Sequence, residues 1–341
     1  MSNLNTVARL AGVSRATAAR AFSSPEMVQP ATREKIYAAA QQSGFRINLV
    51  ARQLRTSTTH LIGVMVPTLD NPVFNEQLSA MEQVARQAGY SLLVATTGYD
   101  PQREQQTLEQ MLSRQVDGLV MTVASSGEQL SESGSGWPPL PVVLVHNESA
   151  AGEVVCLSID NCRAMAEATR YLQQQGHTRI AMVAGPLQQS DRAARRYQGY
   201  WQAMTEAGLV PVPLIEMPEH TRSDAGYLQE LLESTQPLTA VLCSNDLLAI
   251  SLIGQLQRRG IHVPRDLSVV GFDGIALGQM VTPSLCSVVQ PREALGACAV
   301  STLLQLIQGQ QTVSRQLDFE IRQGESVAAP RNIAHTRGNY E

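Results

Sequence analysis

Three side chains near the N-terminus have the types and the spacing to recognise nucleic acid. Arg15, Thr17 and Arg20 fall within two turns of one short helical pattern. Arginine can donate two hydrogen bonds to guanine O6 and N7, and threonine can bond a base or a phosphate. Residues 1–58 carry eight basic and two acidic side chains, a net charge of +6, and since the whole chain carries −4, residues 59–341 carry −10. Basic modules bind phosphate backbones by counterion release, so the sequence predicts a DNA-binding head joined to a body with another task.

A second set of polar side chains follows predicted strands in the acidic body, at the strand ends where ligands of α/β proteins usually bind. Aspartate and asparagine suit hydroxyl groups, and the arginine fork suits an anion. Arg192 and Arg196 lie one helical turn apart, so together they suit a carboxylate or a phosphate. The candidate ligand-binding residues are Asp70, Phe74, His146, Ser190, Arg192, Arg196, Asn245, Asp273 and Gln290.

Several of these residues also fit a purely structural role. Asn245 can cap the helix that follows it, with or without a ligand contact. His146 can be a hydrogen-bonded structural histidine, Phe74 can belong to the core, and Arg192 can lie on a solvated surface. The sequence leaves these alternatives open.

The common motifs of catalytic and cofactor sites are missing from the sequence. It has no GxGxxG after a strand, no P-loop, no GxSxG elbow and no HExxH pattern, and its five cysteines form no CxxC pair. We therefore expect no enzyme activity, no cofactor and no metal. No apolar run approaches the ~20 residues of a membrane helix, and the N-terminus has no signal-peptide pattern, so we expect a cytoplasmic protein without a membrane partner.

The elements that must position the N-terminal side chains are three short helices. Asn3 is a plausible cap for a first helix that Gly12 ends, and Ser14 then caps a second helix, Arg15–Phe22. Two short helices across a glycine turn form a helix-turn-helix unit, whose second helix enters the major groove. A third helix, Pro30–Ser43, closes the small core.

The body alternates strands with amphipathic helices, which predicts parallel sheets covered on both faces and a ligand cleft between two α/β subdomains. The predicted strands are Leu61–Val66, Ser91–Thr96, Gly118–Thr122, Val142–Val145, Val155–Ile159, Ile180–Ala184, Leu214–Met217, Ala240–Cys243 and Ser268–Gly271. The predicted helices are Phe74–Ala88, Gln102–Arg114, Cys162–Gln175, Arg192–Ala207, Ser223–Ser234, Asp246–Arg259 and Glu293–Gln308.

After the third helix the chain resembles the LacI/GalR family of bacterial transcription regulators. The matching residues of the head are Val7, Ala8, Ala11–Ser14, Thr17, Arg20, Thr32–Lys35, Asn48, Ala51 and Leu54. Those of the body include Asp160, Asn161, Gly185, Pro186, Arg196, Gly199, Asn245, Asp246, Val269–Asp273 and Gln290. Thr6, Ala19, Ser23 and Ile47 depart from the family pattern, which leaves the operator sequence open.

The resemblance implies a helix-turn-helix head with a hinge helix, residues 1–58, and a periplasmic-binding-protein-like body of two doubly wound parallel-sheet subdomains, residues 59–335. An N-subdomain would comprise about 60–159 and 291–320, and a C-subdomain about 160–290 and 321–335. Leu54 would be wedged into a minor-groove step. The DNA contacts implied by the head and its family match are Asn5, Ser14, Arg15, Ala16, Thr17, Arg20, Thr32, Asn48, Ala51 and Leu54.

The implied function is a ligand-responsive transcription regulator, a repressor that binds a pseudo-palindromic operator in double-stranded DNA as a homodimer. A sugar or sugar acid in the cleft would be its effector. The C-terminal residues 332–341 lack the apolar heptads of a tetramerisation helix. The alternative is a solute-binding protein of the periplasmic-binding type with no DNA role.

Overall fold

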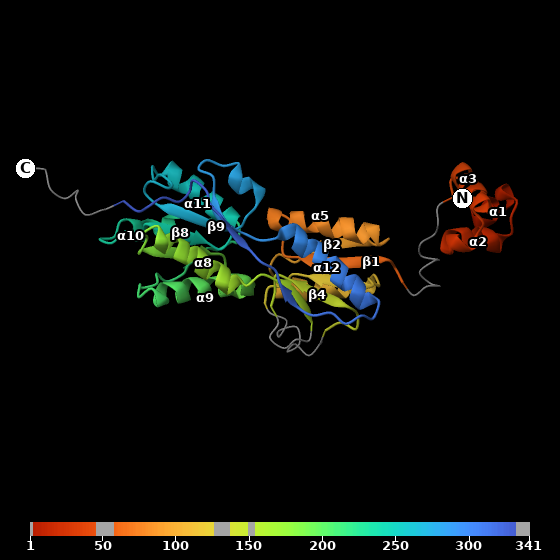
Figure 1. Cartoon of the computed structure of the whole chain (residues 1–341), viewed down its shortest axis with the longest axis horizontal. Helices are drawn as coiled ribbons and strands as arrows, with labels where there is room; N and C mark the ends of the chain where they lie inside the picture. Colours follow the sequence, from red (N-terminus) through yellow and green to blue (C-terminus); the bar gives the residue numbers. More distant parts are fainter. Residues whose placement is uncertain (1–2, 46–57, 126–136, 149–153, 332–341) are drawn as a thin grey trace, which may run out of the picture. The chain divides into compact units, whose positions relative to one another are not determined.

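The computed structural model describes residues 3–45, 58–125, 137–148 and 154–331. The chain divides into two compact units, Met1–Thr59 and His60–Glu341, each of which is described by itself (Figure 1). The predicted hinge residues Asn48, Ala51 and Leu54 lie outside the described residues. Within those residues, no helix combines the length and the apolar character needed to cross a lipid bilayer.

The first unit is built from the three predicted helices, α1 (Leu4–Ala11), α2 (Arg15–Ser23) and α3 (Pro30–Ser43), with a short 3-10 turn, η1 (Pro25–Met27). Asn3 Oδ1 accepts a hydrogen bond from the Thr6 amide at 3.0 Å, and Ser14 Oγ accepts one from the Thr17 amide at 3.0 Å. Each cap satisfies an amide that has no partner within its helix. Gly12 ends α1 with a φ of 65°, a left-handed conformation that glycine adopts without steric cost.

The first sheet of the body runs in the order β11-β5-β4-β3-β1-β2, and all of its neighbouring strands are parallel. Val64 of β1 faces helices α5 and α12, whereas Met65 faces helix α6, so the alternating side chains fill two separate cores. Its strands are β1 (Leu61–Val66), β2 (Ser91–Thr96), β3 (Gly118–Met121), β4 (Val142–Val145), β5 (Val155–Ser158) and β11 (Arg315–Gln316), and its helices are α5 (Pro72–Gln87), α6 (Pro101–Ser113) and α12 (Arg292–Ile307).

The second sheet runs in the order β12-β10-β9-β8-β6-β7 and is parallel except for β12, which is antiparallel to β10. Helices α8 and α9 pack together on one face, and α11 covers the other. Its strands are β6 (Ile180–Ala184), β7 (Ile215–Glu216), β8 (Ala240–Cys243), β9 (Ser268–Asp273), β10 (Cys286–Val289) and β12 (Glu320–Arg322). Its helices are α8 (Asn161–Gln174), α9 (Asp191–Glu206) and α11 (Asp246–Arg258), with 3-10 turns η2 (Leu187–Gln189) and η4 (Ala276–Gln279).

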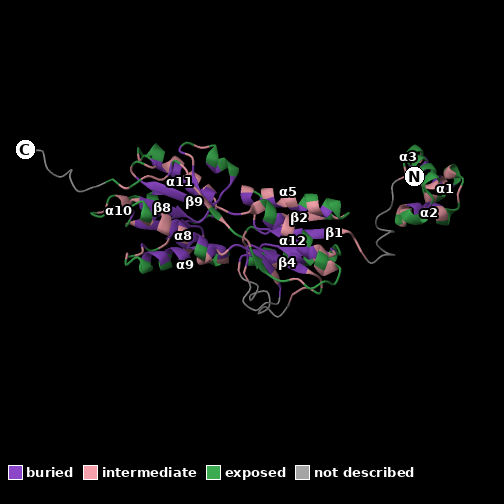
Figure 2. Ribbon diagram, viewed as in Figure 1, coloured by how far each residue is buried: buried purple, intermediate pink, exposed green. Residues whose placement is uncertain are grey.

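The chain passes between the two sheets three times, which makes each subdomain discontinuous. It leaves the first sheet after β5 to form α8, returns after β10 to form α12, and leaves again between β11 and β12. The third passage lies between Gln316 and Glu320, slightly before the predicted boundary at 320/321. In both subdomains, buried strands lie between partly exposed helices (Figure 2). The ends of these strands can meet where the two subdomains face each other.

Strands β10, β11 and β12 were not predicted, and two predicted elements differ from the observed ones. The expected helix Ser223–Ser234 is a 3-10 turn, η3 (Ala225–Leu228), followed by one short helical turn, α10 (Gln229–Leu232). Asp224 Oδ1 accepts from the Gly226 amide at 2.8 Å, which stabilises a turn in place of a regular helix start. Strand β9 extends beyond the predicted Gly271 to Asp273, so the carboxylate of Asp273 ends a strand.

Candidate functional sites

Helix α2 of the head exposes the side chains predicted to contact DNA. Arg15, Ala16 and Arg20 are exposed, whereas Ala18 and Ala21 on the opposite face are buried in the core of the head. The helix thus presents a polar face that is free to enter a groove. Asn5 on α1 is also exposed, and Thr17 and Thr32 are partly buried.

Helix α2 and the η1 turn that follows it are each held by a hydrogen bond from α3 that the sequence did not predict. Tyr37 on α3 donates its hydroxyl to the Ala21 carbonyl at 3.0 Å, and Arg33 donates to the Pro25 carbonyl at 3.2 Å. Thr17 Oγ1 lies 2.8 Å from Ser14 Oγ, so the two predicted contact residues share a hydrogen bond in this structure.

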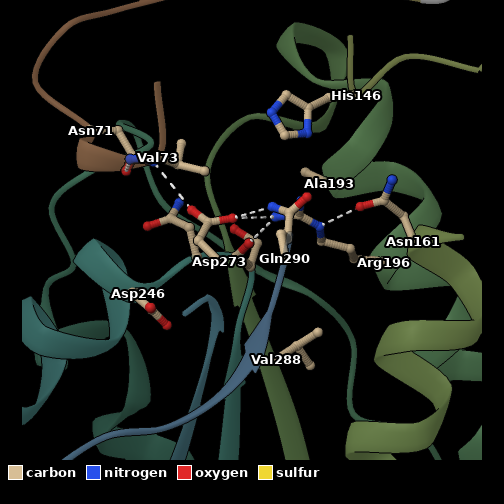
Figure 3. Close-up of polar contacts among 12 residues, drawn as sticks. Asn71, Val73, His146, Asn161, Ala193, Arg196, Asp246, Asp273, Val288 and Gln290 are labelled. Atoms are coloured by element: carbon tan, nitrogen blue, oxygen red, sulfur yellow. Dashed lines mark hydrogen bonds and ion pairs between the residues drawn. The ribbon is translucent and has the colours of Figure 1, made fainter. Parts of the chain in front are cut away.

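In the body, eight of the nine predicted ligand-binding residues line one polar cavity between the subdomains. Figure 3 labels four of them, His146, Arg196, Asp273 and Gln290. The volume of the cavity is about 40 Å³, which is close to the ~30 Å³ share of a single liquid water molecule. The subdomains are therefore closed in this structure, and a ligand of sugar size requires them to separate. The eight residues are Phe74, His146, Ser190, Arg192, Arg196, Asn245, Asp273 and Gln290.

Arg196 is held in the cavity by two hydrogen bonds and a cation–π contact. Its Nε donates to Asn161 Oδ1 at 2.8 Å, and its Nη1 donates to the Ser244 carbonyl oxygen. Its guanidinium carbon lies 3.6 Å from the ring centre of Phe272, a cation–π contact with a buried ring. Burial lowers the pKa of Arg196 to about 10, so the side chain stays positively charged at neutral pH.

Asp273 lies opposite this cation and accepts from both subdomains. Its Oδ1 is 3.7 Å from Arg196 Nη1 and accepts from Gln290 Nε2 at 2.8 Å, and its Oδ2 accepts from Asn71 Nδ2 at 3.3 Å. Burial raises the pKa of Asp273, and Arg196 opposes that effect. Its φ of 110° is strained for a residue with a Cβ, and Tyr99 and His146, which also line the cavity, have φ values of 60° and 71°. Backbone strain of this kind gathers at functional sites.

Both imidazoles of the cavity are neutral. Burial, followed by the positive charge of Arg192, lowers the pKa of His146 to about 3 and that of His220 to about 4. His220 stacks on Tyr99 with ring centres 4.0 Å apart. This aromatic pair lines the cavity and also a neighbouring pocket of about 530 Å³.

Arg192 is buried in the cavity and is not part of a solvated surface. Its Nη1 crosses to the N-subdomain, where it donates to the Val123 carbonyl at 2.7 Å. Beside it, the Asp191 amide donates to the Ala124 carbonyl at 2.9 Å, and Asn147 Nδ2 donates to Asp191 Oδ2 at 2.9 Å. The start of α9 is therefore bound to the opposite subdomain.

Asn245 combines the two roles that the sequence left open. Its Oδ1 accepts from the Leu248 amide at 2.9 Å and so caps α11. Its Nδ2 donates to the His220 carbonyl at 2.7 Å, and the residue lines the cavity. Asn245 thereby fixes the loop that carries the aromatic ring of His220.

Asp70 is the one predicted ligand-binding residue that does not line the cavity. It is exposed, its amide donates to Thr68 Oγ1 at 3.0 Å, and it lines the neighbouring pocket. The inward position belongs to Asn71, which caps α5 through the Val73 amide and donates to Asp273. The Asn71-Pro72 pair is a helix-start signal that could have indicated this cap.

Tyr99 and His220 also line the cavity, although the sequence did not predict them. Each lies three residues after a predicted strand, Ser91–Thr96 for Tyr99 and Leu214–Met217 for His220, so the strand-end pattern could have indicated both. A glycine next to Tyr99 and a proline near His220 also mark loops.

Comparison with known proteins identifies both units. The family model for periplasmic binding proteins and the sugar-binding domain of the LacI family matches residues 59–325, and the model for bacterial regulatory proteins of the lacI family matches residues 3–48. The chain belongs to the LacI family. The match to the head favours a transcription regulator, and nothing in the comparisons favours a solute-binding protein without a DNA role.

Relatives cover nearly the whole of this LacI-family chain. It is 34% identical to the HTH-type transcriptional repressor CytR of Escherichia coli strain K12, over 96% of this chain and 97% of the relative. It is 33% identical to the HTH-type transcriptional regulator GntR of the same strain, over 95% and 98%. The structure of the Lac repressor dimer bound to operator and the anti-inducer ONPF matches with a TM-score of 0.84 and 26% identity, over 96% of this chain and 99% of that chain.

Asp246 lies behind the cavity of this LacI-family body. We expect its carboxyl to make the stability of the body decrease as the pH rises. Burial raises the pKa of Asp246 to about 8, and its carboxyl meets Ser287 Oγ and the Ile275 amide. A carboxyl whose pKa is raised on folding stabilises the fold below its unfolded pKa and loses that contribution as pH rises through the folded pKa. Asp246→Asn can keep both hydrogen bonds, because the Ser287 hydroxyl can accept from the new amide.

We therefore expect the wild-type free energy of unfolding to fall between about pH 5 and pH 7, by about 1.4 kcal/mol per unit for this group, and the Asp246→Asn variant to lose that slope. Urea unfolding followed by the fluorescence of Trp137 and Trp201, both in the body, measures the difference. Parallel slopes for the two proteins would show that Asp246 is already ionised in the folded state.

Proposed function

We propose that this chain is a repressor that binds a pseudo-palindromic operator as a homodimer, with α2 in the major groove, and that a sugar acid in the closed cavity controls it. The observation that carries the proposal is the pairing of an exposed basic helix in the head with a buried cavity that contains two arginines in the body. The relatives are named as transcription regulators, and one of them is a ribose operon repressor, which supports the carbohydrate class.

The proposed role of the head can be tested with a selected DNA site. The full-length protein first selects this site from duplexes of random sequence. Arg20 is exposed near the end of α2, where a guanine contact is worth about 1–3 kcal/mol. We expect Arg20→Ala to weaken binding to the selected site by about tenfold or more and to relax the preference for one base pair. Lys35→Ala on α3, which is also exposed, is the matched control for the loss of a positive charge. Equal losses for the two variants on every sequence would remove Arg20 from base recognition.

Two arginines in the cavity favour an anionic effector over a neutral sugar. Arg192 and Arg196 lie one turn apart on α9 and both line the cavity, while His146 and His220 are neutral. Arg196 faces Asp273 and Arg192 pairs with Asp191 at 3.3 Å, and the two guanidinium forks also suit a carboxylate on the ligand. The remaining amides, from Asn245, Asn71 and Gln290, suit hydroxyl groups.

Arg192 is the residue whose replacement tests the anion. A thermal-shift comparison uses hexuronates and the hexoses of the same ring configuration, starting with D-glucuronate and D-glucose, since a ligand that binds the folded state raises the melting temperature. We expect the acid to stabilise the wild type more than the hexose, and Arg192→Met to weaken acid binding by about tenfold or more. Arg195→Met, three residues further along α9 and partly exposed, is the control. A hexose that binds both proteins equally, with no acid binding, would contradict the acid assignment.

A further inference from the structure

We propose that Gln77 is a positioning residue that holds His146 in a single tautomer, protonated at Nδ1, so that His146 and Gln290 together recognise one hydroxyl group of the effector. The proposal rests on the effector cavity proposed above and deepens it. Gln77 lies on α5, is 1% exposed and does not line the cavity itself. It can therefore act on a ligand only through His146.

The contact between Gln77 and His146 decides which imidazole nitrogen accepts a hydrogen bond. Gln77 Nε2 lies 2.7 Å from His146 Nε2, and both side chains are buried. The structure places the amide nitrogen of Gln77 toward the ring, and in this orientation the amide donates and the imidazole Nε2 accepts. A neutral imidazole has one acceptor and one donor nitrogen, and the pKa of His146, lowered to about 3 by burial, makes the ring neutral. The proton therefore lies on Nδ1.

Asp273 fixes the orientation of the Gln290 amide. Its carboxylate can only accept, so the amide nitrogen of Gln290, 2.8 Å from Oδ1, must be the atom that faces it. This turns Gln290 Oε1 away from Asp273, and Oε1 is buried without a hydrogen bond of standard geometry to any described residue. Gln290 and His146 line the same cavity.

With the proton on Nδ1, His146 offers a hydrogen-bond donor to the ligand and Gln290 offers an acceptor. When the subdomains separate to admit a ligand, the Nδ1–H of His146 can donate to a hydroxyl oxygen, and Gln290 Oε1 can accept from the same hydroxyl. The other tautomer would present two acceptors, which no single hydroxyl can satisfy. A group left unpaired in a buried site costs affinity, so the orientation of the Gln77 amide sets the preference for a hydroxyl at this position.

The first test needs no ligand. Full-length protein labelled with ¹⁵N-histidine is studied by long-range ¹H–¹⁵N correlation, which distinguishes protonated from unprotonated imidazole nitrogens, and the His146 signals are assigned by their loss in His146→Asn. We expect a protonated Nδ1 and an unprotonated Nε2. A protonated Nε2, or an equal mixture of the two tautomers, would overturn the proposal.

The second test reverses the hydrogen bond. Gln77→Glu replaces the donor with a group that only accepts once it is ionised. At a pH above the burial-raised pKa of the new carboxyl, we expect His146 Nε2 to become protonated and D-glucuronate binding to weaken by about tenfold, the equivalent of one hydrogen bond. Gln87→Glu, an exposed position at the end of the same helix, should change neither. A Gln77→Glu variant that keeps the wild-type tautomer and affinity at that pH would overturn the proposal.

Failure of the proposed function has a different signature. If the wild type binds neither hexuronates nor hexoses, the effector class and the recognition of a hydroxyl both fail, whereas the tautomer signal in the free protein reports on Gln77 alone. If Gln77→Glu does not fold, the wild-type spectrum still decides the tautomer.

Discussion

Replacing Arg196 with alanine is expected to abolish the response to effector and to destabilise the body by about 3–5 kcal/mol, the usual cost of removing one partner of a buried ion pair. The variant removes the donor to Asn161 and Ser244, the stacking on Phe272, and the cation that faces the Asp273 carboxylate. Urea unfolding followed by tryptophan fluorescence measures the loss in stability, and effector-dependent release of DNA measures the response.

Two other replacements on α9 separate ligand binding from folding. Arg195→Ala removes a neighbouring guanidinium that pairs with Glu148 at 3.2 Å and is partly exposed, so we expect a change of less than about 1 kcal/mol. Arg196→Lys keeps the charge and should recover part of the stability, but not the hydrogen-bond fork. The head of the Arg196→Ala variant should still bind DNA under conditions in which the body is folded. A full effector response in Arg196→Ala would remove this residue from the cavity's function.

The second large effect is expected at Gly199, where α9 crosses α8. A Cβ at this position would lie 2.0 Å from the Cys162 carbonyl oxygen and 2.8 Å from its carbon, so both backbones would have to move. Glycine to alanine inside a helix normally stabilises by up to ~1 kcal/mol. Here we expect Gly199→Ala to destabilise by about 3 kcal/mol or more, because overpacking outweighs propensity.

Gly254 provides the control, because alanine at this helical position should have its usual stabilising effect. It lies inside α11, and a Cβ there would meet only Arg258 Nη1, at 3.7 Å. Gly254→Ala should therefore stabilise the body slightly, as measured by the same urea unfolding. If Gly199→Ala and Gly254→Ala shift the unfolding midpoint in the same direction, the close approach of α8 and α9 is not the reason for the glycine.

Local sequence patterns were enough for most of the elements. The caps at Asn3 and Ser14, the turn at Gly12 and the alternation of strands and helices were predicted, because capping and hydrophobic period depend on residues close together in the chain. The same reasoning failed for Ser223–Ser234, where apolar residues at helical spacing occur in a segment that a turn at Asp224 interrupts.

The basic charge of the head and the family match of its residues likewise needed only the sequence. Which polar residues share the cavity was decided by tertiary structure. Asn71 and Asp273 are 202 positions apart, and they meet only because the chain passes three times between two sheets. The choice of Asn71 over Asp70 follows from which side chain caps α5, and the contact of Tyr99 with His220 from how closely the subdomains approach. Residue types and periods are local properties of the chain, whereas a cavity between two subdomains depends on distances that no local pattern contains.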